Sequence, residues 1–437
     1  MIRTAIVGTG NRAQLFTEGL GKRDEYRVVA LCDPNPVRIA FHNRMLAAAG
    51  EPAATAWAPD RFEEMLRAER VDLVVVCSVD ATHDAYIVPA LRAGLRVITE
   101  KPMTTDAEKA RRILDADRES GGALTVAFNY RFNPVHRRVH ELLAGGAIGT
   151  IHSVHFEWLL DVHHGADYFR RWHRDKANSG GLMVHKASHH FDLVNWWIGA
   201  RPEVVFGQGR LTFYGASAGR RNGYARDYER AHGAQAALDD PFALHLADNA
   251  TLRALYLDAE AEDGYLRDRN VFTDGVTIED DMGLLVGYDS GASMSYHLIA
   301  YSPCEGYRVA FNGSKGRLEL DVEESVWAQP GLRVESARGA VHGDLAAPTA
   351  GQTRITLRPL WTPPVDMTVD HDHAGHGGAD ARLLATVLDG EPDQAVDRAG
   401  ARDGALALVT GLAANQSFVT GQPVTTASVL DIEGSRG

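Results

Sequence analysis

The sequence predicts an α/β protein with two domains, of which the first is built on a doubly wound parallel sheet. Its 437 residues exceed what one ordinary hydrophobic core accommodates. Over residues 1–128, short apolar segments alternate with longer amphipathic ones, as strands alternate with helices in such a sheet. A glycine-rich turn directly follows the first apolar segment. We expect domains at residues 1–128 and 129–437, with the C-terminal helices free to pack back on the first domain.

Composition and charge exclude several classes of partner. The hydrophobic fraction of 45% and the charged fraction of 24% are those of a soluble globular protein. A net charge of -13 argues against nucleic acid or an anionic membrane as a partner. Three cysteines are too few for a disulfide framework, and no apolar run approaches the roughly 20 residues of a membrane span. Because no signal peptide is visible either, we expect a cytoplasmic protein.

The first strand, residues 2–7, leads into the sequence Gly8-Thr9-Gly10-Asn11-Arg12-Ala13. Turns of this kind hold the pyrophosphate of a dinucleotide against a helix N-terminus, where any Cβ would block the phosphate. Asp33 ends the second strand near the spacing at which a carboxylate binds the adenosine ribose hydroxyls. Because a carboxylate there repels a 2′-phosphate, Asp33 favours NAD over NADP. The alternative is an ordinary strand-end aspartate preceding Pro34.

Further strands and helices alternate up to residue 128. We expect strands at 27–32, 71–77, 95–99 and 124–128, and helices at 36–49, 60–68, 83–93 and 106–120. The strand at 95–99 is followed by Glu100-Lys101-Pro102. Proline forces the chain to turn there, at the carboxyl edge of the sheet, where open parallel sheets bind their ligands.

Several motifs follow one another along the chain. In order they are the glycine turn with Arg12, the strand ending at Asp33, Ser78 followed by His83, Ala90-Leu91-Arg92-Ala93-Gly94 before Glu100-Lys101-Pro102, Tyr130-Arg131-Phe132, and Gly180-Gly181 before His189 and Asp192. In this the chain resembles the glucose-fructose oxidoreductase / inositol dehydrogenase (Gfo/Idh/MocA) family over nearly its whole length. The resemblance implies a Rossmann domain followed by an α/β domain with an open-faced, mainly antiparallel sheet. The face of that sheet typically forms homodimers or homotetramers. One departure is Val79, which replaces the usual proline in a loop that contacts the cofactor.

The resemblance also implies roles for individual residues. The cofactor is expected to be NAD, bound by Gly8, Gly10, Asn11, Arg12, Asp33, Ser78, His83, Glu100 and Lys101. Lys101 is expected to touch the reacting hydroxyl and the nicotinamide ribose, commonly after a cis peptide bond to Pro102. His189 corresponds to a histidine that removes or returns the substrate hydroxyl proton, which suits imidazole because its pKa lies near the operating pH.

Residues 181–199 are predicted to form one helix that ends at Gly199. His185, His189, Asp192 and Trp196 are spaced to share one face of that helix. Asp192 then either supports the site or is structural. The common dehydrogenases carry an aspartate where this chain has His185, and with Lys186 beside it the pocket looks more basic. His185 therefore either adapts the site to an anionic sugar or to extra acid–base chemistry, or simply binds sugar hydroxyls.

The remaining candidate residues are aromatic side chains, which stack on sugars, and cationic or imidazole side chains, which bind hydroxyls or anions. The substrate candidates are Tyr130, Arg131, Tyr168, Arg171, Trp172, Lys186 and His297. Histidines gather at 163–190 and again at 370–376, where Zn or Mn is conceivable. Neither group has the spacing of a closed structural site, so no metal is expected. Residues 215–280 are a polar insertion, expected at the surface but packed.

Two functions from different classes fit these residues. The first is an NAD-dependent oxidoreductase that acts on a hydroxyl of a sugar, glycoside or polyol, with His189, Lys101 and His185 as the catalytic residues. The alternative is an NAD-dependent glycosidase that oxidises the sugar, eliminates the aglycone, adds water and reduces the product again, with His185 and Lys186 as the additional acid–base groups. A regulatory protein that only binds the cofactor is disfavoured because Lys101 and His189 are both present.

Overall fold

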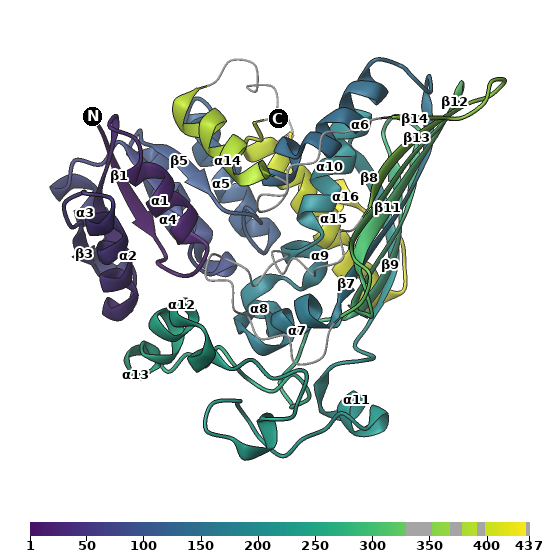
Figure 1. Cartoon of the computed structure of the whole chain (residues 1–437). Helices are drawn as coiled ribbons and strands as arrows, with labels where there is room; N and C mark the ends of the chain where they lie inside the picture. The colour runs from purple at the N-terminus through teal and green to yellow at the C-terminus, as the bar shows by residue number, and fades with distance from the viewer. Residues whose placement is uncertain (329–351, 368–377, 391–397, 434–437) are drawn as a thin grey trace.

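The structure, a computed structural model, describes residues 1–328, 352–367, 378–390 and 398–433. The first domain is a parallel sheet of strand order β3-β2-β1-β4-β5-β6 with helices on both faces (Figure 1). Its strands are β1 (Ile2–Val7), β2 (Tyr26–Cys32), β3 (Thr55–Trp57), β4 (Leu73–Val76), β5 (Arg96–Thr99) and β6 (Leu124–Val126). Its helices are α1 (Ala13–Gly21), α2 (Pro36–Ala48), α3 (Phe62–Ala68), α4 (His83–Arg92) and α5 (Ala107–Ser120). The predicted doubly wound sheet is confirmed.

Local sequence explains these elements. The four residues of β4 are all fully buried, because a central parallel strand is covered on both faces and takes a continuous apolar run. Asn35 caps α2 by accepting hydrogen bonds from the backbone of Val37 and Arg38, and Pro36 occupies the first helical position. Asp106 caps α5 in the same way.

The second domain contains a nine-stranded sheet of order β14-β13-β12-β11-β7-β10-β9-β8-β15. Its strands are β7 (Ile151–Asp161), β8 (Pro202–Arg210), β9 (Asp281–Tyr288), β10 (Ser293–Ser302), β11 (Glu305–Gly313), β12 (Gly316–Ser325), β13 (Thr353–Pro359), β14 (Val365–Met367) and β15 (Val424–Thr425). All neighbours are antiparallel except β7 and β10. The mainly antiparallel sheet that the family resemblance implied is confirmed.

The middle of this sheet joins segments that are far apart in the sequence. β7 lies between β10 and β11 and pairs with both, so the hairpin of β9 and β10 is not adjacent to the hairpin of β11 and β12. Sequence neighbours could not reveal this, since β7 comes from more than a hundred residues earlier in the chain. β13 and β14 extend one edge of the sheet.

Helices cover one face of the large sheet, and Figure 1 shows the other face open. The helices of this domain are α6 (Pro134–Ala144), α7 (Val162–Arg170), α8 (Lys176–Ser179), α9 (Leu182–His185), α10 (Ser188–Ile198), α11 (Gly215–Asn222), α12 (Ala250–Leu252), α13 (Glu260–Asp263), α14 (Ala379–Leu384), α15 (Ala401–Thr420) and α16 (Thr426–Val429). No helix in the described part of the chain is long and apolar enough to cross a membrane.

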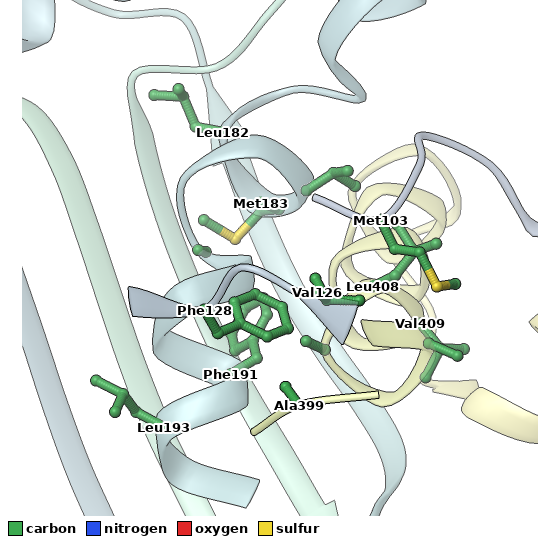
Figure 2. Packing of buried hydrophobic residues seen from close by; sticks show 14 of the residues in the cluster. Met103, Val126, Phe128, Leu182, Met183, Phe191, Leu193, Ala399, Leu408 and Val409 are labelled. Carbon is green, nitrogen blue, oxygen red and sulfur yellow. The ribbon is translucent and has the colours of Figure 1, made fainter. Parts of the chain in front are cut away.

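The two domains share one hydrophobic core. Figure 2 shows Phe128, next to β6 of the first domain, beside Phe191 of α10, and Leu408 of α15 belongs to the same cluster. All three side chains are buried, and α15 contacts α5 and β6 on one side and α9 and α10 on the other. Since apolar burial contributes about 25 cal/mol per Å², this helix fixes the second domain against α5 and β6 of the first.

The insertion between β8 and β9 docks on the first domain. Figure 1 shows α12 and α13 beside that domain, away from the large sheet. The π-helical turn Arg253–Leu257 packs on α2. The insertion is thus packed, as its aromatic residues suggested, and it lies against the dinucleotide-binding edge.

Candidate active site

The glycine turn after β1 has the shape that a dinucleotide needs. Gly8 has a φ of +81°, and a Cβ there would lie 2.5 Å from the backbone of Ser78, so only glycine fits. At Gly10, by contrast, the nearest atom to such a Cβ is the Tyr256 hydroxyl at 3.8 Å. Asp33 follows β2, and its two carboxylate oxygens accept hydrogen bonds from the backbone N–H groups of Thr9 (2.7 Å) and Asn35 (2.8 Å). These residues fit the pyrophosphate and the adenosine ribose of NAD.

His83 and Glu100 connect the loops that follow the central strands. The ring nitrogens of His83 lie 2.9 Å from the carbonyl of Pro102 and 3.1 Å from that of Ser78, which ties the two loops together. Glu100 accepts a 2.6 Å hydrogen bond from Arg12 Nε. The other side of the same guanidinium binds both carboxylate oxygens of Asp380, at 3.0 and 2.9 Å. Arg12 therefore joins the glycine turn to Glu100 and to α14.

Lys101 is directed toward the second domain. Its peptide bond to Pro102 is cis, and its Nζ donates a 3.3 Å hydrogen bond to the main-chain carbonyl of His185. Burial lowers the pKa of Lys101 to about 8, against the opposing attraction of the Asp80 and Glu100 carboxylates. Lys101 thus loses its proton far more readily than a solvated lysine does.

His185 is paired with Asp80, a residue of the first domain. Its Nδ1 lies 2.5 Å from Asp80 Oδ2, and both side chains are buried. Burial lowers the pKa of His185 well below its usual value, and Lys101 and Arg171 lower it further. Burial raises the pKa of Asp80, although Lys101 and Arg171 favour its charged form. A neutral imidazole held by a carboxylate can accept or pass on a proton.

Two predicted substrate residues, Tyr168 and Trp172, lie around the His185 ring together with His173. The rings of Tyr168 and Trp172 lie edge-on to it, with centroids 5.6 and 6.0 Å away, and His173 lies closer at 4.1 Å. Arg171 donates to Asp167 at 2.9 Å and lies against the His173 ring, with Nε 3.1 Å from Nδ1. Asp167 is a fully buried carboxylate. Its hydrogen bond from Arg171 anchors the loop after α7, which carries Trp172 and His173.

His189 has different neighbours. Its ring stacks on Tyr130 with centroids 4.3 Å apart and an interplanar angle of 12°. The Tyr130 hydroxyl accepts a 3.2 Å hydrogen bond from Lys186 Nζ, which also lies 4.8 Å from the centroid of the Trp158 ring. Burial lowers the pKa of Lys186, while Glu305 and Glu324 oppose the change. Tyr130 and Lys186 therefore belong to the His189 side of the site.

The predicted single helix over 181–199 is wrong. The chain forms α9 and α10, which are separated by a turn at Lys186 and Ala187 although both residues keep right-handed helical φ and ψ angles. The His185 carbonyl accepts from Lys101 Nζ and, at 3.2 Å, from Ser188 Oγ rather than from a helical backbone amide.

Two predicted substrate residues lie elsewhere. Arg131 is buried and binds Asp192 through two hydrogen bonds of 2.8 and 2.5 Å, with Asp403 3.2 Å away, so its fork is occupied by protein carboxylates. His297 lies on the open face of the large sheet, 3.3 Å from Asp281. Its neighbour Tyr296 faces the helices and bonds His190 at 2.7 Å, and alternation along β10 then turns His297 away from them.

Asp80, His173 and Asp380 are site residues that sequence reasoning missed. Asp80 directly follows Val79, which stands where the family usually has a proline. That difference was the one feature of the sequence that pointed to Asp80. Asp380 lies in an alanine-rich helix and gives no signal in the sequence. Among the described residues, no group of three or more His, Cys, Asp or Glu side chains could hold a metal ion. The histidines at 371, 373 and 376 lie outside the described residues.

A dinucleotide turn in one domain, with a partly buried lysine bonded to the main chain of a second domain, is the arrangement of the NAD-binding oxidoreductases. Two family models agree: the NAD-binding Rossmann fold of the oxidoreductase family matches residues 2–128, and its C-terminal alpha/beta domain matches residues 140–426. The chain belongs to the Gfo/Idh/MocA oxidoreductase family. Its cofactor is NAD.

Known proteins resemble the chain over different lengths. A protein of Bacillus subtilis (strain 168) named as the oxidoreductase YteT is 35% identical over 440 residues, covering 95% of this chain and 96% of YteT. Inositol 2-dehydrogenase of Rubrobacter xylanophilus is 28% identical over 218 residues, 48% of this chain and 56% of that enzyme. The solved structure of aldose-aldose oxidoreductase from Caulobacter crescentus, complexed with glycerol, aligns with a TM-score of 0.62 at 18% identity, covering 97% and 99% of the two chains.

The WlbA dehydrogenase of Bordetella pertussis, solved with NADH and UDP-GlcNAcA, aligns with a TM-score of 0.60 at 17% identity and covers 97% of each chain. At these identities both solved structures share the fold with this chain. The family match and the YteT match, which span nearly the whole chain, identify it as an oxidoreductase.

Proposed function

We propose that the protein is an NAD-dependent dehydrogenase that acts on a hydroxyl group of a sugar, glycoside or polyol. The observation that carries the proposal is the hydrogen bond from Lys101 Nζ to the His185 carbonyl, one helical turn before His189. A hydroxyl bound between the domains would meet a lysine from one and imidazoles from the other. The 28% identity to an inositol 2-dehydrogenase supports a polyhydroxylated substrate.

The roles follow from the chemistry of each group. His189 takes the hydroxyl proton during oxidation and returns it during reduction, since neutral imidazole is a competent base near pH 7. Protonated Lys101 stabilises the negative charge that develops on the reacting oxygen, in a buried position where electrostatic stabilisation is strong. Asp80 orients His185. NAD, when bound, supplies the acceptor for the hydride.

The surroundings support an acidic sugar among the possible substrates. Lys186 is buried near the histidines, Lys101 and Arg171 are partly buried there, and His185 stands where the family resemblance implies a carboxylate. The dehydrogenase of Bordetella pertussis was solved with a nucleotide sugar acid. A carboxylate on the substrate would offset part of this positive charge.

A second candidate is the NAD-dependent glycosidase, and the Asp80–His185 pair is the observation that favours it. Elimination and hydration beside an oxidised carbon need acid–base groups beyond Lys101 and His189, and this pair is one more. In such a reaction the cofactor is reduced and then reoxidised in each turnover.

One experiment separates the two candidates. The protein is incubated with NAD and a panel of neutral and acidic sugars, polyols and aryl glycosides, and both NADH and free aglycone are followed. The dehydrogenase predicts NADH in step with substrate loss and no cleavage. Aglycone release without net NADH, together with solvent deuterium in the sugar, would instead establish the glycosidase.

A further inference from the structure

The insertion between β8 and β9 reaches the glycine turn itself. The backbone N–H of Asn11 donates a 3.1 Å hydrogen bond to the hydroxyl of Tyr256. Amides at this position, at the start of the helix after the turn, are the donors that bind a dinucleotide's phosphates. A side chain of the second domain therefore occupies a phosphate-binding amide of the first.

The same insertion is fastened beside Asp33. Asn35 donates a 2.9 Å hydrogen bond from Nδ2 to the carbonyl of Ala259. Arg38 donates from Nε to the carbonyl of Leu255 at 3.1 Å, and its Nη1 lies 2.7 Å from Asp263 and 4.0 Å from Asp33. The insertion thus extends from the pyrophosphate turn to the carboxylate for the adenosine ribose.

This contact buries an excess of guanidinium groups. Arg38 and Arg267 each lie 5.7 Å from the centroid of the Tyr256 ring. Arg267 shares the carboxylate of Asp167 with Arg170 and Arg171, so three guanidiniums meet one carboxylate. Arg38 Nη2 and Arg267 Nη1 are buried and have no hydrogen-bond partner among the described residues. Buried charged donors without partners are costly, and an anion would satisfy them.

We propose that Arg38, Tyr256 and Arg267 form the second half of a diphosphate site, facing the glycine turn across the domain boundary. The ligand is the diphosphate of the dinucleotide. When it binds, a phosphate oxygen replaces the Tyr256 hydroxyl at the Asn11 amide, and the two guanidiniums gain the acceptor they lack. Because the insertion must part from the turn to admit the nucleotide, NAD also leaves slowly. This inference depends on the family's cofactor and not on the identity of the sugar.

The test measures binding without turnover. Dissociation constants for NAD, ADP-ribose, inorganic pyrophosphate and adenosine are determined by titration calorimetry for the wild type, Arg267→Met and Arg38→Met. Arg253→Met is the matched control, since that arginine lies in the same insertion in an exposed pair with Asp258. Loss of one charge-assisted hydrogen bond should weaken the three phosphate ligands about tenfold or more. Adenosine binding in Arg267→Met and all ligands in the control should change less than about twofold.

The NAD release rate, followed by displacement, should rise by a similar factor in Arg267→Met. If Arg267→Met does not fold, two other variants replace it. Arg267→Lys keeps a positive charge beside Asp167, and Arg38→Met is compared with the wild type for binding of the phosphate ligands. Unchanged NAD and pyrophosphate binding in the folded variants would overturn the proposal. An equal loss for adenosine would also overturn it, because the effect would then be structural. Intact NAD binding with weakened binding of UDP-glucuronic acid would assign the guanidiniums to the substrate instead, and would again overturn it.

Discussion

Asp80 is the residue whose role depends most directly on the contact between the domains. Only its carboxylate among the described residues accepts a hydrogen bond from the His185 ring, and it lies on the opposite domain. The sequence offered His185 as an unusual replacement but gave no partner for it. A partner 105 residues away could not be recognised without the fold.

Asp80→Asn should lower kcat about 10²-fold while KM changes little, because an amide no longer fixes the imidazole in the same protonation state. The pH dependence of kcat should also change shape. The measurement is steady-state kinetics over a pH series, with exposed Asp60→Asn as the control. A wild-type profile in the variant would show that Asp80 has no part in the reaction.

Loss of the Lys101 proton should limit the activity at alkaline pH. Its pKa is lowered from the usual lysine value to about 8, so the ammonium is complete well below pH 8 and is lost as pH rises through that value. Since the charged form stabilises the developing oxyanion, kcat/KM should fall above about pH 8. Lys101→Arg, which stays protonated, should lose most of its activity yet lack this alkaline limb. An alkaline limb unchanged in that variant would assign the pKa to another group.

At the scale of single elements, five of the six parallel strands were predictable because they carry their own signals, and the three-residue β3 was missed. The break between α9 and α10 could not be predicted in this way. His185 and His189 keep helical spacing in the sequence, but Lys101 and Ser188 bind the His185 carbonyl and replace the helical hydrogen bond. One of these two contacts comes from the first domain, so it cannot be recognised in the local sequence.

The pair of Arg131 and Asp192 fixes α10 to the segment that follows β6. Asp192→Ala should lower the free energy of unfolding by about 3–5 kcal/mol, because it leaves a buried guanidinium without its main partner. Asp289→Ala, which breaks a partly exposed pair with Arg201, should cost less than about 1 kcal/mol. Urea unfolding of both variants gives the comparison. Equal losses would mean that the buried pair is no more important than a surface one.

For the whole molecule, the sequence predicted the fold class and NAD as the cofactor, and the roles proposed for Lys101 and His189 come from the family resemblance. It did not predict that the insertion would join the two domains, since polar loops with scattered aromatic residues do not reveal where they dock. His297 was predicted to contact the substrate but lies on the open face of the large sheet, for a related reason. Which face of a strand is covered depends on the whole sheet and not on the strand alone.

The open face of the nine-stranded sheet bears on assembly. It carries exposed apolar side chains such as Leu285, which is 59% exposed. The homodimer or homotetramer expected from the family resemblance remains a prediction. Light scattering after size exclusion should give a mass of two or four chains, and Leu285→Glu should lower that mass if this face is the interface. A wild-type mass of one chain would contradict the expectation.

The central claim is that Lys101, held against the second domain, acts in an NAD-dependent oxidation. The most direct test is the rate of NADH formation by Lys101→Met with the best substrate from the panel, beside its NAD dissociation constant. Lys22→Met, which removes an exposed lysine paired with Glu18, is the control. We predict a rate at least about 10³-fold lower for Lys101→Met, with NAD binding changed less than about tenfold and the control unaffected. Full activity in Lys101→Met would contradict the account.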